Sequence, residues 1–316
     1  MRNSVKLVGN LDVLRSGRGI VLTVGVFDGV HLGHQHLLKT MLARASEAGA
    51  GSAVVTFDPH PQSVIAPGTQ PPLLTTVEER VRLIRQVGVD VVGILRFTRR
   101  ISRMSAEQFV DLLLGHFPLA ELWMGPDSAF GYRRQGTPSV LSRIGEGKGF
   151  LVKVVSQKRD DGTAVSSTEI RNLLLRGDVV DAARLLGRLY ALTGKVVTGF
   201  ERGRDLGFPT ANVVPPPGLL VPANGIYAVR VHVDLGGNGG VEYNGVVNIG
   251  TRPTFDDGAG RSIEVHILDF VGNLYGERIR LEFVQRLRDE ARFPSVQQLV
   301  EQIKHDVELA RVVLRR

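Results

Sequence analysis

The stretch Ile20-Val-Leu-Thr-Val24-Gly-Val-Phe-Asp-Gly-Val-His31-Leu-Gly-His34 decides the fold of the first half of this chain. Residues 20–26 form a short apolar run rich in β-branched side chains, which predicts a central strand of a parallel sheet. After Gly33, apolar residues such as Leu38 and Met41 recur at helical spacing. A glycine-rich turn from strand into helix gathers free backbone N–H groups and the positive end of the helix dipole. The stretch therefore predicts a phosphate site.

Two imidazoles lie at this turn. We expect His31 and His34 to donate hydrogen bonds to phosphate oxygens and to stabilise charge on a leaving pyrophosphate. A bare His-x-x-His more often supplies turn residues that satisfy backbone groups. The strand, the Phe-Asp-Gly turn and the helix around this pair favour the phosphate site.

The composition is that of a globular protein with two domains. The 316 residues exceed a typical single domain, and 43% hydrophobic and 22% charged residues are ordinary values. No segment approaches the ~20 consecutive apolar residues of a membrane span, and residues 1–10 lack the apolar core of a secretory signal. The absence of cysteine excludes disulfides, thiolate catalysis and cysteine-ligated zinc. We expect a cytoplasmic protein with no membrane partner.

The net charge of +7 makes nucleic acid a partner to consider. The basic residues are mostly arginines spread along the chain, without a run of five or six, and aromatic residues make up 6%. Arginine suits polyanionic small molecules such as ATP equally well. We interpret the charge as a solvated surface with phosphate sites and expect no nucleic-acid partner.

The two halves of the chain differ in periodicity. Up to about Gly187, predicted strands alternate with predicted helices, which indicates an α/β domain with a parallel sheet covered on both faces. The capping-box patterns Thr76-x-x-Glu79 and Ser105-x-x-Gln108 mark two helix starts. From about Thr193, short alternating strands and turn clusters predict a small antiparallel β-barrel, followed by a helix over 296–313. We place the domains at 1–187 and 188–316.

The turn at His31 and His34 resembles the signature of the His-x-Gly-His nucleotidyltransferases, in the form found in bacterial bifunctional riboflavin kinase/FAD synthetases. Similar segments continue almost to the C-terminus. The resemblance implies a Rossmann-like nucleotidyltransferase domain that adenylylates FMN to FAD, followed by a barrel that phosphorylates riboflavin to FMN. ATP with Mg²⁺ is then required, and riboflavin, FMN and FAD are substrates or products. The oligomeric state stays open.

Further segments of the first domain match this family. Gly125-Pro-Asp-Ser-Ala-Phe-Gly131 resembles a loop at the flavin and nucleotide pocket, although Ser128 and Ala129 replace a bulkier aromatic and a polar or basic residue. Ser166-Ser-Thr-Glu-Ile-Arg171 is similar to the family segment in which the arginine holds the transferring phosphate. Its alternative interpretation is simple helix capping. The resemblance implies nucleotide or flavin binding by Gly25, Phe27, Asp28, Gly29, His60, Asp127, Ser166, Ser167 and Thr168, and catalysis by His31, His34 and Arg171.

The barrel carries the kinase motifs. Gly207-Phe-Pro-Thr-Ala-Asn212 is similar to the Pro-Thr-Ala-Asn motif, in which Thr210 and Asn212 ligate magnesium; the alternative is a β-turn stabilised by these side chains. Glu264 lies in a strand whose apolar residues alternate with it, and the family strand carries the base that accepts the ribityl 5′-hydroxyl proton. Residues 248–255 and 286–293 border the flavin pocket in the family. Gly207, Pro209 and Asn248 are assigned to ligand binding on this resemblance.

Two other functions remain open. A single-activity adenylyltransferase for another phosphorylated substrate would leave Glu264 and residues 209–212 unexplained. A nucleic-acid-binding module would use the basic charge, against the dispersed arginines and scarce aromatics. ATP-dependent consumption of riboflavin separates both from the bifunctional enzyme.

Overall fold

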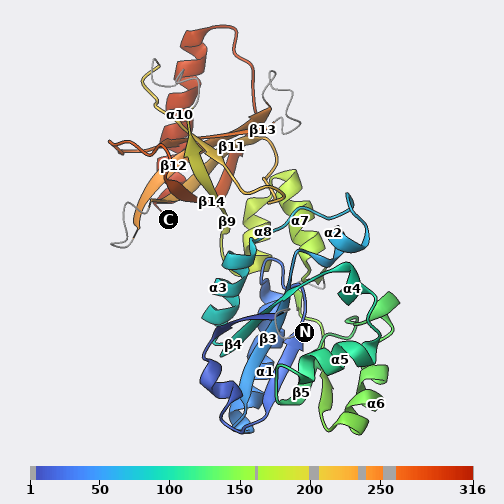
Figure 1. Ribbon diagram of the computed structural model, residues 1–316. Helices are drawn as coiled ribbons and strands as arrows, with labels where there is room; N and C mark the ends of the chain where they lie inside the picture. The colour runs from blue at the N-terminus through green and yellow to red at the C-terminus, as the bar shows by residue number, and fades with distance from the viewer. Residues whose placement is uncertain (1–4, 161–162, 199–205, 234–239, 252–260, 316) are drawn as a thin grey trace. The chain divides into compact units, whose positions relative to one another are not determined.

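The computed structural model describes residues 5–160, 163–198, 206–233, 240–251 and 261–315. They fall into two compact units, Met1–Ser167 and Thr168–Arg316 (Figure 1). Each unit is built around its own sheet, an open one in the first and a closed barrel in the second. Among the described helices, none is long and apolar enough to cross a membrane.

A six-stranded sheet in the order β1-β4-β3-β2-β5-β6 forms the centre of the first unit. Its strands are β1 (Val5–Gly9), β2 (Ile20–Val24), β3 (Gly51–Asp58), β4 (Val91–Arg96), β5 (Leu119–Met124) and β6 (Leu151–Val154). The pairings among β2 to β6 are parallel, which confirms the predicted sheet. The additional strand β1, which the sequence did not predict, pairs antiparallel with β4. A five-residue edge strand carries too little periodicity to be recognised.

The strand order reverses at β2, which has β3 on one side and β5 on the other. In open α/β sheets, ligands bind beyond the carboxyl ends of the strands at such a switch point. The loops that follow β2, β3 and β5 therefore meet where the predicted first site lies.

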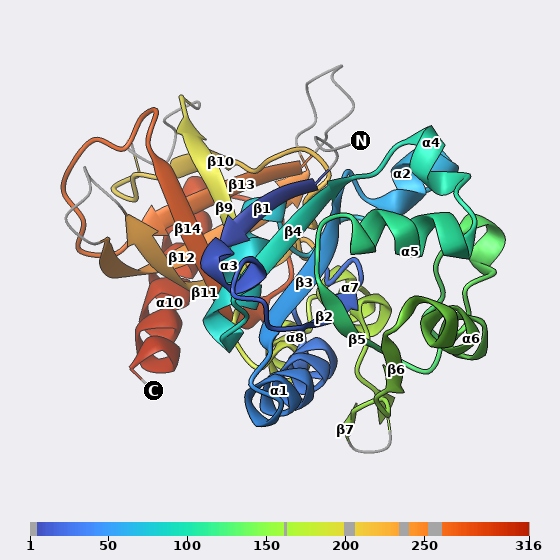
Figure 2. The ribbon, with the colours of Figure 1, turned by 60° about the horizontal axis from the view of Figure 1, so that its bottom comes forward.

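Helices cover both faces of this sheet, as predicted (Figure 2). The elements outside the sheet are η1 (Leu11–Leu14), α1 (Leu32–Glu47), α2 (Pro61–Ile65), α3 (Val77–Val87), α4 (Arg99–Ser102), α5 (Ala106–Leu114), η2 (Tyr132–Arg134), α6 (Pro138–Lys148) and the small hairpin of β7 (Arg159–Asp160) and β8 (Thr163–Ala164). One hydrophobic cluster joins Ile20 and Leu22 of β2 to Phe109 of α5. The other joins Val21 of β2 to Leu38 of α1 and to α3. Alternate side chains of β2 thus pack into hydrophobic clusters on opposite faces of the sheet, which explains the continuous apolar run of this strand.

The predicted caps start two of these helices. Thr76 Oγ1 accepts a hydrogen bond from the Glu79 N–H at 3.2 Å at the start of α3. At the start of α5, Ser105 and Gln108 form a reciprocal capping box. The sequence therefore identified these boundaries by their side-chain chemistry.

The second unit is a closed antiparallel barrel in the order β10-β13-β12-β11-β14-β9, as predicted. Its elements are α7 (Ser167–Arg176), α8 (Val179–Leu186), β9 (Tyr190–Val197), β10 (Ala211–Val214), β11 (Gly225–Val233), β12 (Val241–Thr251), β13 (Arg261–Ile267), β14 (Arg278–Arg288) and α10 (Val296–Leu314). Helix α8 contacts β9 and β14, so α7 and α8 group with the barrel by contacts. The functional boundary after residue 187 stays a prediction.

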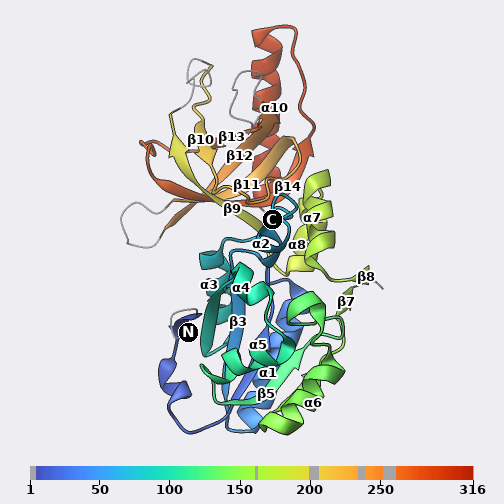
Figure 3. The ribbon, with the colours of Figure 1, turned by 45° about the vertical axis from the view of Figure 1, so that its right-hand side comes forward.

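The C-terminal helix α10 packs on β11, β12 and β14 (Figure 3). Ala310 and Leu314 contact Ala228 of β11 in a small hydrophobic cluster. The same face also carries Asp306, which is 3% exposed and accepts hydrogen bonds from Nε and Nη2 of Arg288 at 2.9 and 2.7 Å. The helix is therefore held to the barrel by an ion pair with a buried carboxylate as well as by apolar contact.

Candidate active sites

The predicted histidine pair lies where the strand β2 gives way to the helix α1. His31 is the N-cap of α1 and is 5% exposed. Its Nδ1 accepts a hydrogen bond from the backbone N–H of His34 at 3.3 Å. The two rings are stacked, with centroids 3.6 Å apart and planes 19° apart. Both imidazoles therefore sit together at the positive end of the α1 dipole.

Gly33, between the two histidines, has little room for a side chain. A Cβ atom at this position would lie 3.0 Å from the carbonyl oxygen of Val165 and 3.1 Å from both Nδ1 and Cε1 of His31. The backbone before α7 therefore packs directly against the turn. A glycine permits this close approach, which explains the Gly in the His-x-Gly-His pattern.

His34 is held in its neutral form. Burial, followed by the nearby charges of His31 and Arg80, lowers the pKa of His34 well below its ordinary value. The ring of Phe27 lies edge-on to it at 5.0 Å, and its Nδ1 has no hydrogen-bond partner among the described residues. A neutral imidazole beside another at 3.6 Å avoids charge repulsion and keeps one N–H to donate.

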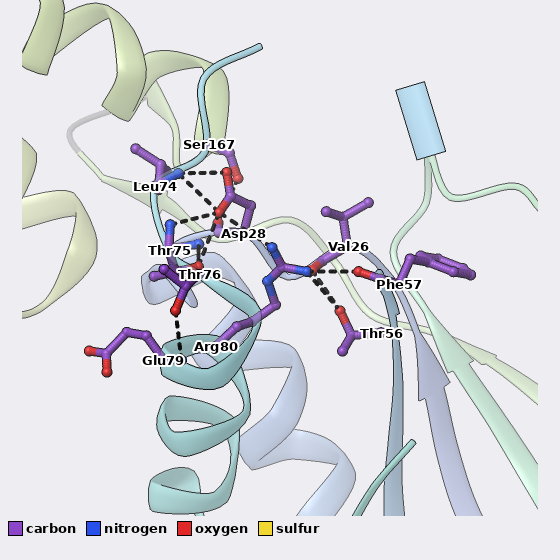
Figure 4. Close-up of polar contacts among 11 residues, drawn as sticks. Val26, Asp28, Thr56, Phe57, Leu74, Thr75, Thr76, Glu79, Arg80 and Ser167 are labelled. Atoms are coloured by element: carbon purple, nitrogen blue, oxygen red, sulfur yellow. Dashed lines mark hydrogen bonds and ion pairs between the residues drawn. The ribbon is translucent and has the colours of Figure 1, made fainter. Parts of the chain in front are cut away.

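The turn before His31 has an unusual backbone. Phe27 and Val30 have φ of 52° and 40°, values rarely adopted by residues other than glycine, and Gly29 has φ of 82°. Asp28 is 2% exposed, and its carboxylate accepts hydrogen bonds from the backbone N–H groups of Leu74 and Thr75 (Figure 4). The side chain of Asp28 thus holds the loop before α3.

Figure 4 also shows Arg80, which the sequence analysis missed. It projects from α3 and is 2% exposed, and Nη1 donates to Phe57 O at 3.1 Å. The signal was present, because Arg80 stands beside Val81 and one turn before Ile84 on the apolar side of an amphipathic helix. A charged residue within such a stripe indicates a buried partner.

In the segment Ser166-Ser167-Thr168, Ser167 contacts the turn before His31. Ser167 Oγ donates a hydrogen bond to the backbone carbonyl of Asp28 at 2.9 Å. Ser166 is half-buried next to it, whereas Thr168 is exposed at the start of α7. Arg171 lies one turn into α7, in the second compact unit, so its role in phosphate binding stays a prediction.

In the first unit, a cavity of about 910 Å³ opens at the carboxyl ends of the sheet strands. It is lined from the loops after β2, β3 and β5, and brings together Gly25, His60 and Asp127. The two departures from the family pattern, Ser128 and Ala129, line it as well. His60 also caps α2, with its Nδ1 accepting the Gln62 N–H at 3.1 Å. The cavity is large enough for a planar aromatic ligand and is mostly apolar.

The predicted kinase residues form a row across three strands of the barrel. Glu264 of β13 is directly paired with Asn212 of β10 on one side and with Asn248 of β12 on the other. Side chains at paired positions lie on the same face of a sheet. Asn212 is 7% exposed, and Oδ1 of Asn248 is buried without a hydrogen-bond partner among the described residues. An orphaned acceptor next to the predicted base fits a hydroxyl-bearing ligand.

The segment 207–212, which carries the predicted magnesium motif, contacts β13 beside this row of residues. Nδ1 of His266 donates to the carbonyl of Pro209 at 2.8 Å, and its ring lies edge-on to Phe208. Pro209 and Thr210 line a cavity of about 560 Å³ together with Val265. Gly207 precedes it with φ of 84°. Residues 199–205 and 252–255 of the predicted loops lie outside the described residues.

Comparisons with known proteins match both halves of the chain. The family model described as FAD synthetase matches residues 14–169, and the one described as riboflavin kinase matches residues 186–314. The fold and the two sites thus define a two-part transferase of the flavin-cofactor class.

Its relatives extend over nearly the whole chain. A protein of Pseudomonas fluorescens, named bifunctional riboflavin kinase/FMN adenylyltransferase, is 40% identical over 311 residues, which is 98% of each chain. The protein of the same name from Escherichia coli strain K12 is 38% identical over 93% of this chain and 92% of its own. The chain therefore belongs to the bifunctional riboflavin kinase/FMN adenylyltransferase family.

One solved structure has the same fold over the same length. It is described as a macrolide-efflux protein from Streptococcus pneumoniae and is 31% identical, with a TM-score of 0.83. The similarity covers 96% of this chain and 97% of that one. It supports the combination of an α/β unit with a barrel in one chain.

Proposed function

We propose that this protein makes flavin cofactors in two ATP-dependent steps. The barrel phosphorylates riboflavin to FMN, and the α/β domain transfers AMP from ATP to FMN, giving FAD and pyrophosphate. The observation that carries the proposal is the match of nearly the whole chain to this family. The assignment keeps the functional domains at 1–187 and 188–316.

In the adenylylation step, a phosphate oxygen of FMN attacks the α-phosphorus of ATP, and the bond to the leaving pyrophosphate breaks. No general base is needed, because a phosphate monoester is already anionic near neutral pH. His31 and His34 donate hydrogen bonds to the phosphate oxygens, and Arg171 supplies a fork of donors. Ser166, Ser167 and Thr168 border the nucleotide. The stacked rings at the N-terminus of α1 support this alignment.

The flavin of this step fits the cavity of about 910 Å³. Its lining residues Gly25, His60 and Asp127 come from three loops at the switch point. Apolar walls with a few polar groups are typical of sites for planar ligands. Ser128 and Ala129 leave one wall smaller than the family pattern implies.

In the phosphorylation step, Glu264 accepts the proton of the ribityl 5′-hydroxyl as this oxygen attacks the γ-phosphorus of ATP. The bond from the γ-phosphorus to the β–γ bridging oxygen breaks, and ADP leaves. Asn248 offers its buried Oδ1 to a hydroxyl of the same ligand. The nucleotide fits beside Pro209 and Gly207, at the cavity of about 560 Å³.

A magnesium ion fits the residues of this site. A hydroxyl from Thr210 and an amide oxygen from Asn212 are hard oxygen donors, to which ATP adds anionic ones. When bound, Mg²⁺ neutralises charge on the ATP phosphates. The described residues hold no group of three or more His, Cys, Asp or Glu side chains arranged for a metal. In this proposal ATP supplies the anionic ligands. Because both steps consume ATP, we place the protein in the cytoplasm.

Two variants test whether the two reactions occur at separate sites. Purified protein is incubated with ATP, Mg²⁺ and either riboflavin or FMN, and the flavins are resolved chromatographically over time. Glu264→Ala is expected to lose riboflavin phosphorylation by at least about 10²-fold while FMN adenylylation survives. His31→Ala is expected to do the reverse.

Matched controls are Glu242→Ala on β12 and His36→Ala on α1, which lie outside both sites. Both should keep the two activities. Loss of both activities in a folded Glu264→Ala or His31→Ala protein would contradict the two-site division. Absence of both activities from the unmodified protein would refute the proposed function.

A further inference from the structure

A buried cation lies next to the first site, and the proposed chemistry does not use it. Arg80 of α3 is 2% exposed. Its Nη1 donates to Thr56 Oγ1 at 3.3 Å and to Phe57 O at 3.1 Å, and its Nη2 lies 3.9 Å from Asp28 Oδ1 (Figure 4). A buried charge is strongly unfavourable unless it is paired and hydrogen-bonded. A buried guanidinium such as that of Arg80 is therefore a candidate for a functional role.

The anionic partner, Asp28, connects further segments. Its carboxylate accepts hydrogen bonds from the backbone N–H of Leu74, and from both the N–H and the hydroxyl of Thr75. Thr75 Oγ1 in turn accepts the N–H of Gly29 at 3.1 Å. The backbone carbonyl of Asp28 accepts from Ser167 Oγ. The loop before α3 and Ser167 are thus tied to the turn.

Strand β3 is tied to the same turn. Thr56 Oγ1 receives the hydrogen bond from Arg80 and donates one to the carbonyl of Val26 at 2.9 Å. Arg80 therefore acts on both ends of the turn, directly at Asp28 and through Thr56 at Val26. A guanidinium can do this because its donors spread in a planar fork.

The turn held in this way is strained. Phe27 and Val30 have φ of 52° and 40°, and a positive φ at a β-branched residue such as Val30 is a true outlier. Such a backbone persists only where the surroundings over-determine it. His31 follows immediately, and its position and stacking on His34 depend on the path of this turn.

The charge of Arg80 also affects the imidazole of His34. Together with burial and His31, it lowers the pKa of His34. A stacked pair with centroids 3.6 Å apart would be pushed apart if both rings were cationic. The cation therefore favours the neutral, stacked arrangement.

We propose that Arg80 is a positioning residue for adenylyl transfer: through Asp28 and Thr56 it holds the strained turn that presents His31 and His34 to the ATP phosphates. It acts without touching the substrate. This inference rests on the proposed function of the α/β domain.

The experiment compares Arg80→Gln and Arg80→Lys with the unmodified full-length protein. For Arg80→Gln we expect FMN adenylylation to fall by roughly 10²-fold, the scale of a displacement of catalytic groups by about 1 Å. Arg80→Lys keeps the charge but loses the fork, so we expect an intermediate loss of about tenfold. Riboflavin phosphorylation in the barrel should be unchanged. Arg82→Gln on the same helix, where the exposed Arg82 pairs with Glu79, is the matched control and should keep both activities.

Folding of the first unit is followed separately. The single tryptophan of the chain, Trp123, lies on β5 beside β2, so its fluorescence reports on this unit alone. Thr75→Val gives a second variant that removes one link of the network and keeps the cation. We expect native fluorescence with reduced adenylylation in at least one Arg80 variant and in Thr75→Val.

A titration separates positioning from a general structural role. In NMR spectra recorded against pH, the ring of His34 should titrate at higher pH in Arg80→Gln than in the unmodified protein, and should stay unshifted in Thr75→Val. A folded Arg80→Gln protein that makes FAD at the normal rate would overturn the inference. So would loss of native Trp123 fluorescence in both Arg80 variants, because Arg80 would then serve folding alone. If the unmodified protein makes no FAD from FMN, the proposed function fails instead.

Discussion

Replacing Gly33 by alanine tests whether packing at the histidine turn controls adenylyl transfer. The new Cβ would meet the carbonyl of Val165 at 3.0 Å and the ring of His31 at 3.1 Å, closer than the ~3.5 Å of an optimal contact. The ring of His31 cannot retreat freely, because it is stacked on His34 at 3.6 Å. We expect the neighbours to move by a few tenths of an ångström.

The expected effects on stability and on rate differ. Alanine at a helical position is intrinsically favoured over glycine by about 0.5–1 kcal/mol, which offsets part of the steric cost. The free energy of unfolding should therefore change little. A displacement of about 1 Å costs ~10²-fold in rate, so the smaller shift of His31 should slow FMN adenylylation by about tenfold, or ~1.4 kcal/mol of activation free energy.

The assay measures FAD formed from FMN and ATP, with riboflavin phosphorylation in the same preparation as the internal reference. Gly147→Ala in α6 is the matched control, because its Cβ position has no described atom within 4 Å beyond its chain neighbours and the backbone of its own helix. It should leave both activities unchanged and raise the free energy of unfolding by about 0.5–1 kcal/mol. Normal adenylylation by a folded Gly33→Ala protein would refute the claim that the position of His31 limits the reaction.

Two further predictions concern stability. The pKa of His34 is lowered in the folded state, so just below pH ~6.5 only the unfolded protein takes up a proton at His34. The free energy of unfolding of the first unit should therefore decrease as the pH is lowered through this range, by up to about 1.4 kcal/mol per pH unit. Urea unfolding followed by Trp123 fluorescence at pH 7 and 5.5 measures this, and His34→Phe should flatten the dependence; an equally steep dependence in that variant would assign it to another group. In the barrel, Asp306→Ala removes the carboxylate that pairs with Arg288 and should lower the free energy of unfolding by about 2 kcal/mol. Thermal inactivation of riboflavin phosphorylation reports it, with the exposed Glu308→Ala as control, and equal inactivation of the two variants would show that the pair contributes nothing.

The sequence alone predicted most of the architecture, because hydrophobic periodicity and caps are local signals. The apolar run of β2, the caps at Thr76 and Ser105 and the alternation in β13 all appear where expected. The resemblance to a known family then named candidate residues in both domains. The short strand β1 was missed, since five residues at a sheet edge show no clear period.

Tertiary structure decided how those residues meet. The pairing of Glu264 with Asn212 and Asn248 depends on the register of three strands, and a register shift by one residue would move each side chain to the other face. The crowding at Gly33 depends in part on Val165, far along the chain. The ion pair of Arg80 with Asp28 depends on burial, which no local pattern records. Sequence periodicity specifies which residues face a core, whereas contacts between distant segments specify which buried groups touch.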